Sequence, residues 1–187
     1  MSVELQKVLL RVLPFLGIFL GLLIAVKRKK IHPASLALQK PNSVKWFIFW
    51  WAGFLLFILL TEVLLHHFGL IKVGKWNNTF FPTLIKIIGI VILAPIGEEL
   101  VFRGILLHKL KQGNINSHVA IFIQAVLFTL VHSAAFDLTL LSNIGKLQIF
   151  TDAMLFAYAK ENTKSIFTPI TMHAMGNLIA VIEQFIL

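Results

Sequence analysis

Two adjacent glutamates, Glu98 and Glu99, lie with Arg103 at the edge of an apolar stretch of the chain. A charged side chain at the centre of a bilayer costs at least about 2.5 to 3.5 kcal/mol, so ionisable residues in such stretches are expected to be paired or functional. Glu99 and Arg103 are four residues apart and can pair on one helix face. Glu98 lies about 100° around the helix from Glu99 and can therefore face a different partner.

Two later apolar stretches each carry a histidine with a neighbour four residues away, which puts both on one helix face. Phe128 precedes His132, and His173 precedes Asn177. With a rise of about 1.5 Å per residue, Glu98, His132 and His173 all fall in the middle of a hydrocarbon core about 30 Å thick. We therefore expect these side chains to meet in one site.

This set of side chains has the chemistry to hydrolyse an amide. A carboxylate held near a neutral histidine can remove a proton from water. The tetrahedral intermediate then needs donors aimed at its oxyanion, which an imidazole and a carboxamide on one face supply. The predicted catalytic residues are the water-activating pair Glu98 and His132 and the oxyanion pair His173 and Asn177. The predicted supporting residues are Glu99, Arg103 and Phe128.

Other common catalytic motifs are absent from the sequence. It contains no G-x-S-x-G nucleophile elbow, no P-loop and no H-E-x-x-H zinc motif. It also contains no cysteine, which excludes disulfides, thiolate nucleophiles and cysteine metal ligands. Histidine and carboxylate must therefore carry any chemistry.

The composition indicates an integral membrane protein. Hydrophobic residues make up 58% of the 187 positions and the mean hydropathy is +0.87, against roughly 45 to 50% apolar residues in a soluble domain. The polar segments are too short to fold separately, so residues 1–187 are expected to form a single membrane domain. The net charge of +9 comes from basic residues that punctuate apolar segments, so the expected partner is the lipid bilayer and not nucleic acid.

The expected fold is an all-α, polytopic membrane bundle of about six helices with an active-site cavity inside it. The predicted spans are residues 8–26, 43–65, 82–96 with a continuation over 98–110, 117–135, 138–158 and 165–187. Pro95 and Gly97 are expected to bend or break the third helix just before the glutamates. Residues 138–158 are expected to form a short or broken helix, and Asn116 or Ser117 is expected to cap the helix before it.

The basic residues predict the orientation of the bundle in a cell membrane. Ten of them fall in segments on one predicted side: Lys27, Arg28, Lys29, Lys30, Lys40, Lys45, Lys109, Lys111, Lys160 and Lys164. Five fall on or near the other side: Lys7, Arg11, Lys72, Lys75 and Lys146. The excess of positive charge predicts that the first side is cytoplasmic in a multi-pass protein.

The ordered motifs resemble the CPBP family, which includes the CAAX prenyl proteases and bacteriocin-processing or immunity proteins and is also called the Abi family of intramembrane proteases. The match consists of E-E-x-x-x-R from Glu98 to Arg103, F-x-x-x-H ending at His132 and H-x-x-x-N from His173 to Asn177. Each motif is common alone, and the ordered trio is specific. The resemblance covers residues 82–187, which we expect to be the catalytic core.

The resemblance implies an endopeptidase that acts on a peptide or membrane-protein substrate, a prenylated C-a-a-X peptide being one possibility. It implies Glu98 as the base assisted by His132, with an oxyanion site at His173 and Asn177. The family is usually described as metalloprotease, and two histidines with two glutamates can hold Zn²⁺ if three ligands converge around an open position. Because the same residues work without a metal, we expect no required cofactor.

Three other interpretations stay open. Glu99 with Arg103 can be only a structural ion pair, and polar residues such as His173 and Asn177 often join helices. A bacteriocin self-immunity protein can use the same fold by proteolysis or by binding, with bacteriocin-system components as partners. A proton-coupled transporter also uses glutamate and histidine in membranes, although the sequence shows no internal repeat. Outside the catalytic set, Asp152 is expected to line a cavity or form a pair, and Glu183 to be structural or interfacial.

Overall fold

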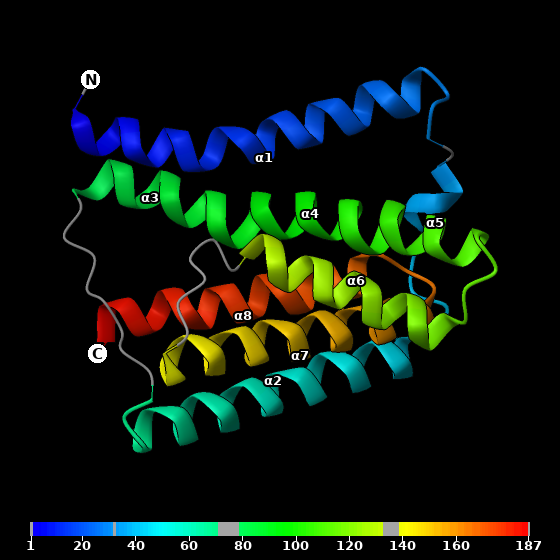
Figure 1. Ribbon diagram of the computed structural model, residues 1–187. Helices are drawn as coiled ribbons and strands as arrows, with labels where there is room; N and C mark the ends of the chain where they lie inside the picture. Colours follow the sequence, from blue (N-terminus) through cyan, green and yellow to red (C-terminus); the bar gives the residue numbers. More distant parts are fainter. Residues whose placement is uncertain (1, 32, 71–78, 133–138, 187) are drawn as a thin grey trace.

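The computed structural model describes residues 2–31, 33–70, 79–132 and 139–186, which form helices and no strand. In apolar surroundings a helix satisfies every backbone N–H and C=O within one segment. The predicted all-α membrane fold is confirmed. The elements are α1 (Val3–Lys27), the 3₁₀ turn η1 (Pro33–Leu36), α2 (Val44–His67), α3 (Phe80–Ile88), η2 (Gly89–Leu93), α4 (Ala94–Glu99), η3 (Leu100–Leu106), α5 (Leu107–Gln112), α6 (Ser117–His132), α7 (Leu140–Thr163) and α8 (Phe167–Ile186), shown in Figure 1.

Short polar side chains begin several of these helices. The hydroxyl of Ser2 accepts a hydrogen bond from the backbone N–H of Leu5, and that of Ser43 accepts one from Trp46. For α6 the side chain of Asn116 accepts the N–H of His118, which assigns the predicted cap to Asn116. These caps satisfy backbone donors that have no partner inside the helix.

A continuous helix from Phe80 to Gln112 carries both glutamates. The expected break at Pro95 and Gly97 is wrong, because the chain continues as α4 through both residues. The helix instead widens to π-helical turns in η2 before this segment and in η3 after it. A π turn accommodates an extra residue without ending the helix, and such turns are frequent at functional sites.

The helices are stacked around this long helix, as Figure 1 shows. Helix α1 packs against α3, η2 and α4, whereas α8 packs against the same helix from another side and also contacts α2 and α7. Helix α6 packs mainly against α7. The long helix and α8 are therefore the central elements, and both termini lie at the same end of the bundle.

Helix α7 is one regular helix of 24 residues, so the expectation of a short or broken helix there is wrong. The side chain of Thr139 caps its first turn by accepting the N–H of Ser142, and the helix packs against α6, α8 and α2. The predicted ends of spans at residues 135, 138 and 187 lie outside the described residues.

Three helices in the described part of the chain are long and apolar enough to cross a membrane: α1, α2 and the helix Phe80–Gln112. Only 11% of the most apolar part of α1 and of α2 is buried, so both present apolar side chains outward to lipid. Helix α6 is apolar but shorter, with 16 residues. The inner helices α7 and α8 are less apolar, because they carry polar residues that line cavities.

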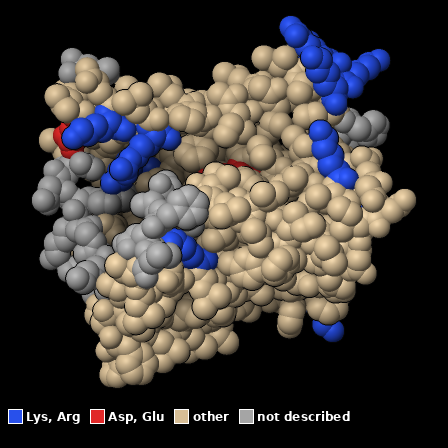
Figure 2. Space-filling view, viewed as in Figure 1, with Lys and Arg blue, Asp and Glu red and all other residues tan. Residues whose placement is uncertain are grey.

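The surface of the bundle matches this arrangement. Figure 2 shows a face that is almost free of charge along its middle, with Lys and Arg gathered mainly towards the two ends. A small area of acidic atoms lies in a hollow near the centre of this face. Lys72 and Lys75, which were assigned to the less basic side, lie outside the described residues.

Candidate active site

The predicted site residues come from three parts of the bundle that pack together. Glu98 and Glu99 end α4, and Arg103 lies in the following π turn η3. His132 is the last residue of α6, and His173 lies on α8. The predicted meeting of these side chains is confirmed by the contacts below.

Glu98 is the point on which the two histidines converge. The Nε2 atom of His132 lies 3.2 Å from Glu98 Oε2, and the Nε2 atom of His173 lies 3.8 Å from the same oxygen. The side chain of Glu98 is 13% exposed, and that of His132 is 30% exposed. This half of the site is therefore open enough to meet water.

The contacts of His132 determine where its protons lie. Its Nδ1 atom is 2.8 Å from the carbonyl oxygen of Phe128, which can only accept a hydrogen bond, so Nδ1 carries a proton. If the imidazole of His132 is neutral, its Nε2 atom carries no proton and can only accept a hydrogen bond. An ionised carboxylate can also only accept, so these two groups cannot bond each other without a further proton. The contact between Nε2 and Glu98 therefore contains one shared proton, held by the imidazole or by the carboxyl group.

Glu99 has a closed environment. Its Oε1 atom accepts a hydrogen bond of 2.9 Å from Nη1 of Arg103, and both side chains are fully buried. The same oxygen lies 2.8 Å from Nδ1 of His173, and Nη2 of Arg103 donates to the carbonyl of Ala153 at 3.2 Å. The predicted pairing of Glu99 with Arg103 is confirmed, and Glu99 in addition orients His173.

The charges of these residues balance. Glu99 offsets Arg103, and the shared proton offsets the negative charge of Glu98. When Nδ1 of His173 donates to Glu99, its Nε2 atom holds a lone pair that faces Glu98. A cluster that is neutral overall is the arrangement that a low dielectric tolerates best.

Aromatic rings hold the histidines in place. Phe128 stacks on His132 with ring centroids 4.1 Å apart, as its place on the same helix face predicted. The guanidinium carbon of Arg103 lies 4.3 Å from the centre of the Phe128 ring. Phe156 stacks on His173 at 5.2 Å. These rings limit the rotation of both imidazoles and wall the site.

Asn177 lies close to His173 on α8 but uses its amide partly for structure. Its Nδ2 atom donates to the carbonyl oxygen of Ile90 at 2.8 Å. Ile90 belongs to the π turn η2, in which the backbone hydrogen-bond register is shifted. The amide carries a second N–H, so one donor is left for other partners.

A cavity of about 290 Å³ adjoins this cluster. His132, His173 and Asn177 line it, together with residues of α2 and α7. Its volume is near the lower end of the roughly 300 to 1,000 Å³ that is typical of ligand pockets. Glu98 itself does not line this cavity, but it contacts His132 and His173, which do.

The described residues do not fit a metal site of three protein ligands. No group of three His, Cys, Asp or Glu side chains in the described ranges is arranged to hold an ion. Glu98, His132 and His173 approach one another, but His132 and Glu98 are in direct contact at 3.2 Å, and an ion between them would have to replace this contact. The chemistry below is therefore derived from protein groups alone.

A family model described as type II CAAX prenyl endopeptidase Rce1-like matches residues 79–179. The chain belongs to the Rce1-like family. The matched range contains all seven predicted site residues and more than half of the chain. No curated protein and no solved structure matches it. At the level of the family, membership supports a CAAX-type intramembrane endopeptidase and agrees with the apolar helices of a membrane protein.

The cavity of this Rce1-like protein has polar lining residues that sequence reasoning missed. Glu62 of α2 and Gln148 of α7 both line it, and the Nε2 atom of Gln148 donates to Glu62 at 2.9 Å. A carboxylate inside the apolar run of α2 was a signal that could have found Glu62. Asp152 lines the cavity as predicted, and Glu183 lines a neighbouring one.

Proposed function

We propose that this protein is an intramembrane endopeptidase in which Glu98 and His132 activate the water that cleaves a peptide or membrane-protein substrate. The observation that carries the proposal is the approach of two imidazole Nε2 atoms to one oxygen of Glu98, at 3.2 and 3.8 Å. Three groups that exchange protons thus surround one point beside a cavity. The Rce1-like family supports the reaction class.

In the first step water attacks the scissile carbonyl carbon. Glu98, in the state with the shared proton on His132, takes a proton from this water as its oxygen bonds to the carbon. The carbonyl becomes an oxyanion, and the contact between Glu98 and His132 now holds two protons. The positive charge gained by the pair balances the negative charge of the oxyanion.

His173 becomes an oxyanion donor through this proton transfer. Its Nε2 atom holds a lone pair while Nδ1 donates to Glu99, so it can accept a proton from Glu98 across 3.8 Å. The resulting imidazolium faces Glu99 on one side and the oxyanion on the other. The second N–H of Asn177 is the other proposed donor, because the first is used by Ile90.

In the last step the intermediate collapses and the carbon–nitrogen bond breaks. The leaving nitrogen takes a proton from the His132 imidazolium, and the His173 imidazolium returns its proton to Glu98, where Glu98 and His132 share it again. The site then has the protonation state with which it began. The substrate must be locally unwound, because a helical segment hides its carbonyls in its own hydrogen bonds.

The proposed setting is a multi-pass protein of the cell membrane. Three apolar helices can span the bilayer, and lysines follow α1 and precede α2 at one end of the bundle. The positive-inside rule assigns that end to the cytoplasm. The reacting groups then lie within the apolar part of the bundle and are reached through the cavity.

The test is cleavage of a library of membrane peptides by the purified protein in liposomes, with products identified by mass spectrometry. Glu98→Gln is compared with Glu4→Gln, which makes the same chemical change outside the cluster. The carboxylate of Glu4 accepts hydrogen bonds from Thr79. We expect cleavage by the wild type and by Glu4→Gln, and none by Glu98→Gln.

Thermal unfolding of each variant shows whether the fold is retained. Cleavage that persists in folded Glu98→Gln protein would contradict the assigned base. A parallel series with a zinc chelator distinguishes catalysis by protein groups alone from catalysis that needs zinc. If the chelator abolishes wild-type cleavage and added zinc restores it, the mechanism by protein groups alone is wrong.

A further inference from the structure

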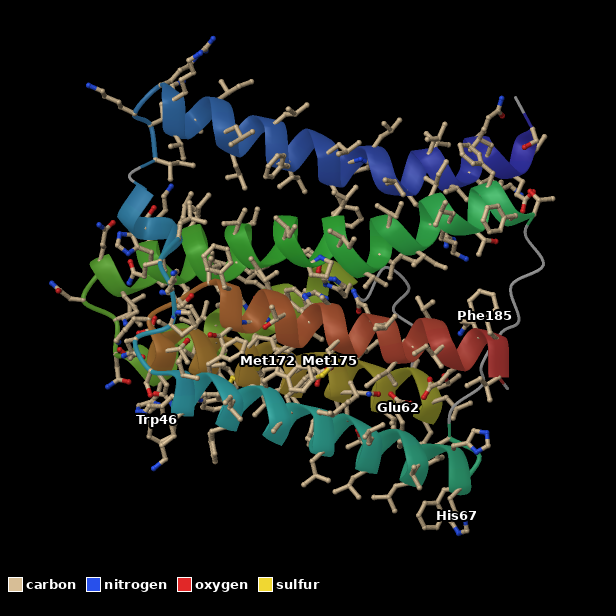
Figure 3. All side chains as sticks on the ribbon, turned by 180° about the vertical axis from the view of Figure 1, so that it is seen from behind. Trp46, Glu62, His67, Met172, Met175 and Phe185 are labelled. Atoms are coloured by element: carbon tan, nitrogen blue, oxygen red, sulfur yellow. The ribbon has the colours of Figure 1, made fainter. Side chains whose placement is uncertain are left out.

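A second cavity continues from the one at the proposed catalytic residues. It has a volume of about 440 Å³ and lies between α2, α7 and α8 towards the end of the bundle that holds both termini. The two cavities share the lining residues Glu62, Gln148 and Ala180. Figure 3 shows Glu62 on α2, on the side that faces α7 and α8. Together the cavities form one tract from the histidines outward.

This tract is acidic in a chain that is strongly basic. Glu62 and Asp152 line the inner cavity, and Glu62 and Glu183 line the outer one. Among the described residues, no Lys or Arg lines either cavity. The whole chain has 17 basic and 8 acidic residues, so three of its few carboxylates are gathered in this tract. Arg103 lies near Asp152 but lines neither cavity, and its Nη1 atom is bonded to Glu99.

Asp152 gives the tract an unused hydrogen-bond acceptor. Its Oδ1 atom is buried and has no partner among the described residues. A buried carboxyl oxygen without a partner is costly, and a cation or donor that enters the cavity removes this cost. Glu62 is held in place by Gln148, so its carboxylate is oriented towards the same space.

We propose that this acidic tract binds a lysine or arginine side chain of the substrate beside the scissile bond. The proposal rests on the proposed function, because His132 and His173 line the same inner cavity as Glu62 and Asp152. A peptide cation fits better than a metal ion, since no three acidic or histidine side chains in the described ranges are arranged as ligands. The protein is thus selective for peptides with positive charge near the cleaved bond.

Binding is measured separately from cleavage, with the full chain in nanodiscs of neutral lipid and empty nanodiscs as the blank. The probes are fluorescent apolar peptides that differ at one interior position, which is Lys, Gln or Glu. The protein carries Glu98→Gln so that bound peptides stay intact. We expect the Lys peptide to bind about tenfold more tightly than the Gln peptide, and the Glu peptide to bind most weakly.

The carboxylates are then removed by changes that keep their shape. Asp152→Asn and Glu62→Gln are each expected to abolish most of the preference for Lys, whereas Glu4→Gln, which lines neither cavity, is expected to keep it. Equal binding of the Lys and Gln peptides would overturn the proposal, and so would a preference that survives both changes. Because binding is read without cleavage, an inactive wild type would count against the proposed function alone.

Discussion

Glu98 and Glu99 are adjacent in the chain and lie in opposite environments. Glu99 is fully buried, bonded to Arg103 at 2.9 Å and in contact with His173 at 2.8 Å. Glu98 is partly exposed, and its described partners are histidines, at 3.2 and 3.8 Å. The turn of about 100° between neighbouring residues of a helix is enough to separate them.

The difference fits the proposed division between a structural role for Glu99 and a chemical role for Glu98. An ion pair with a fixed charge, such as Glu99 with Arg103, orients its neighbours but cannot gain or lose a proton at little cost. The contact between Glu98 and His132 holds a proton that either group can carry. His173 touches both glutamates and therefore links the two roles.

The largest expected effect is on turnover, from Glu98→Gln. Glutamine keeps the shape of the side chain but cannot accept the proton from water, so kcat for a cleaved peptide should fall by about 10² to 10⁴. The free energy of unfolding should change by less than about 1 kcal/mol, because no fixed ion pair is lost. Peptide kinetics and SDS titration in mixed micelles measure the two quantities. If the variant is folded and its kcat is near normal, Glu98 is not the catalytic base and does not differ from Glu99 in its role.

The next largest effect is on stability, from Arg103→Met. It leaves Glu99 charged and buried without its cation, which should cost about 3 to 5 kcal/mol of unfolding free energy. Adding Glu99→Gln should recover much of this loss, since the double variant has no uncompensated charge. The same SDS titration provides the double-mutant cycle. Equal stability of single and double variants would mean that Glu99 is not the charge that Arg103 balances.

The sequence predicts the pairs within one helix well because the rule for them is local. Spacing by four residues pairs Glu99 with Arg103 and places Phe128 on His132, and both contacts are present. The cavity is harder to predict, because Glu62 and Gln148 meet across 86 positions. The break expected at Pro95 is absent for a related reason: the helix continues with π turns on both sides of this segment, and no local pattern in the sequence predicts them.

Phe128 contacts both the structural pair Glu99–Arg103, through Arg103, and the proposed catalytic pair Glu98–His132, through His132. Its ring lies against the guanidinium of Arg103 at 4.3 Å and stacks on His132 at 4.1 Å. Phe128→Leu removes the cation–π contact and leaves a small void, so we expect a loss of about 1 to 2 kcal/mol of unfolding free energy. Because His132 loses its stacking partner, kcat should also fall, and less than in Glu98→Gln. An unchanged kcat with lowered stability would confine Phe128 to a structural role.

The smallest effect concerns a third carboxylate, Glu161, at the end of α7 and outside the apolar segments. Burial alone would raise the pKa of Glu161 from 4.5, but hydrogen bonds and charge attraction from Lys111 and Lys160 outweigh burial and lower the pKa to about 2. The stabilisation is therefore complete above about pH 5 and is lost as the pH falls from 4.5 to about 2.

Because the side chain of Lys111 is 32% exposed, we expect a contribution of only about 1 kcal/mol, which high salt reduces further. Comparing wild type with Glu161→Gln by SDS titration at pH 7 and at pH 3 measures it. The difference in unfolding free energy should shrink at pH 3, because the carboxyl of the unfolded chain is then largely protonated whereas the folded one, with its pKa of about 2, is still mostly ionised. A difference that stays constant from pH 7 to pH 3 would contradict the lowered pKa of Glu161 and would mean that Lys111 and Lys160 do not stabilise its charged form.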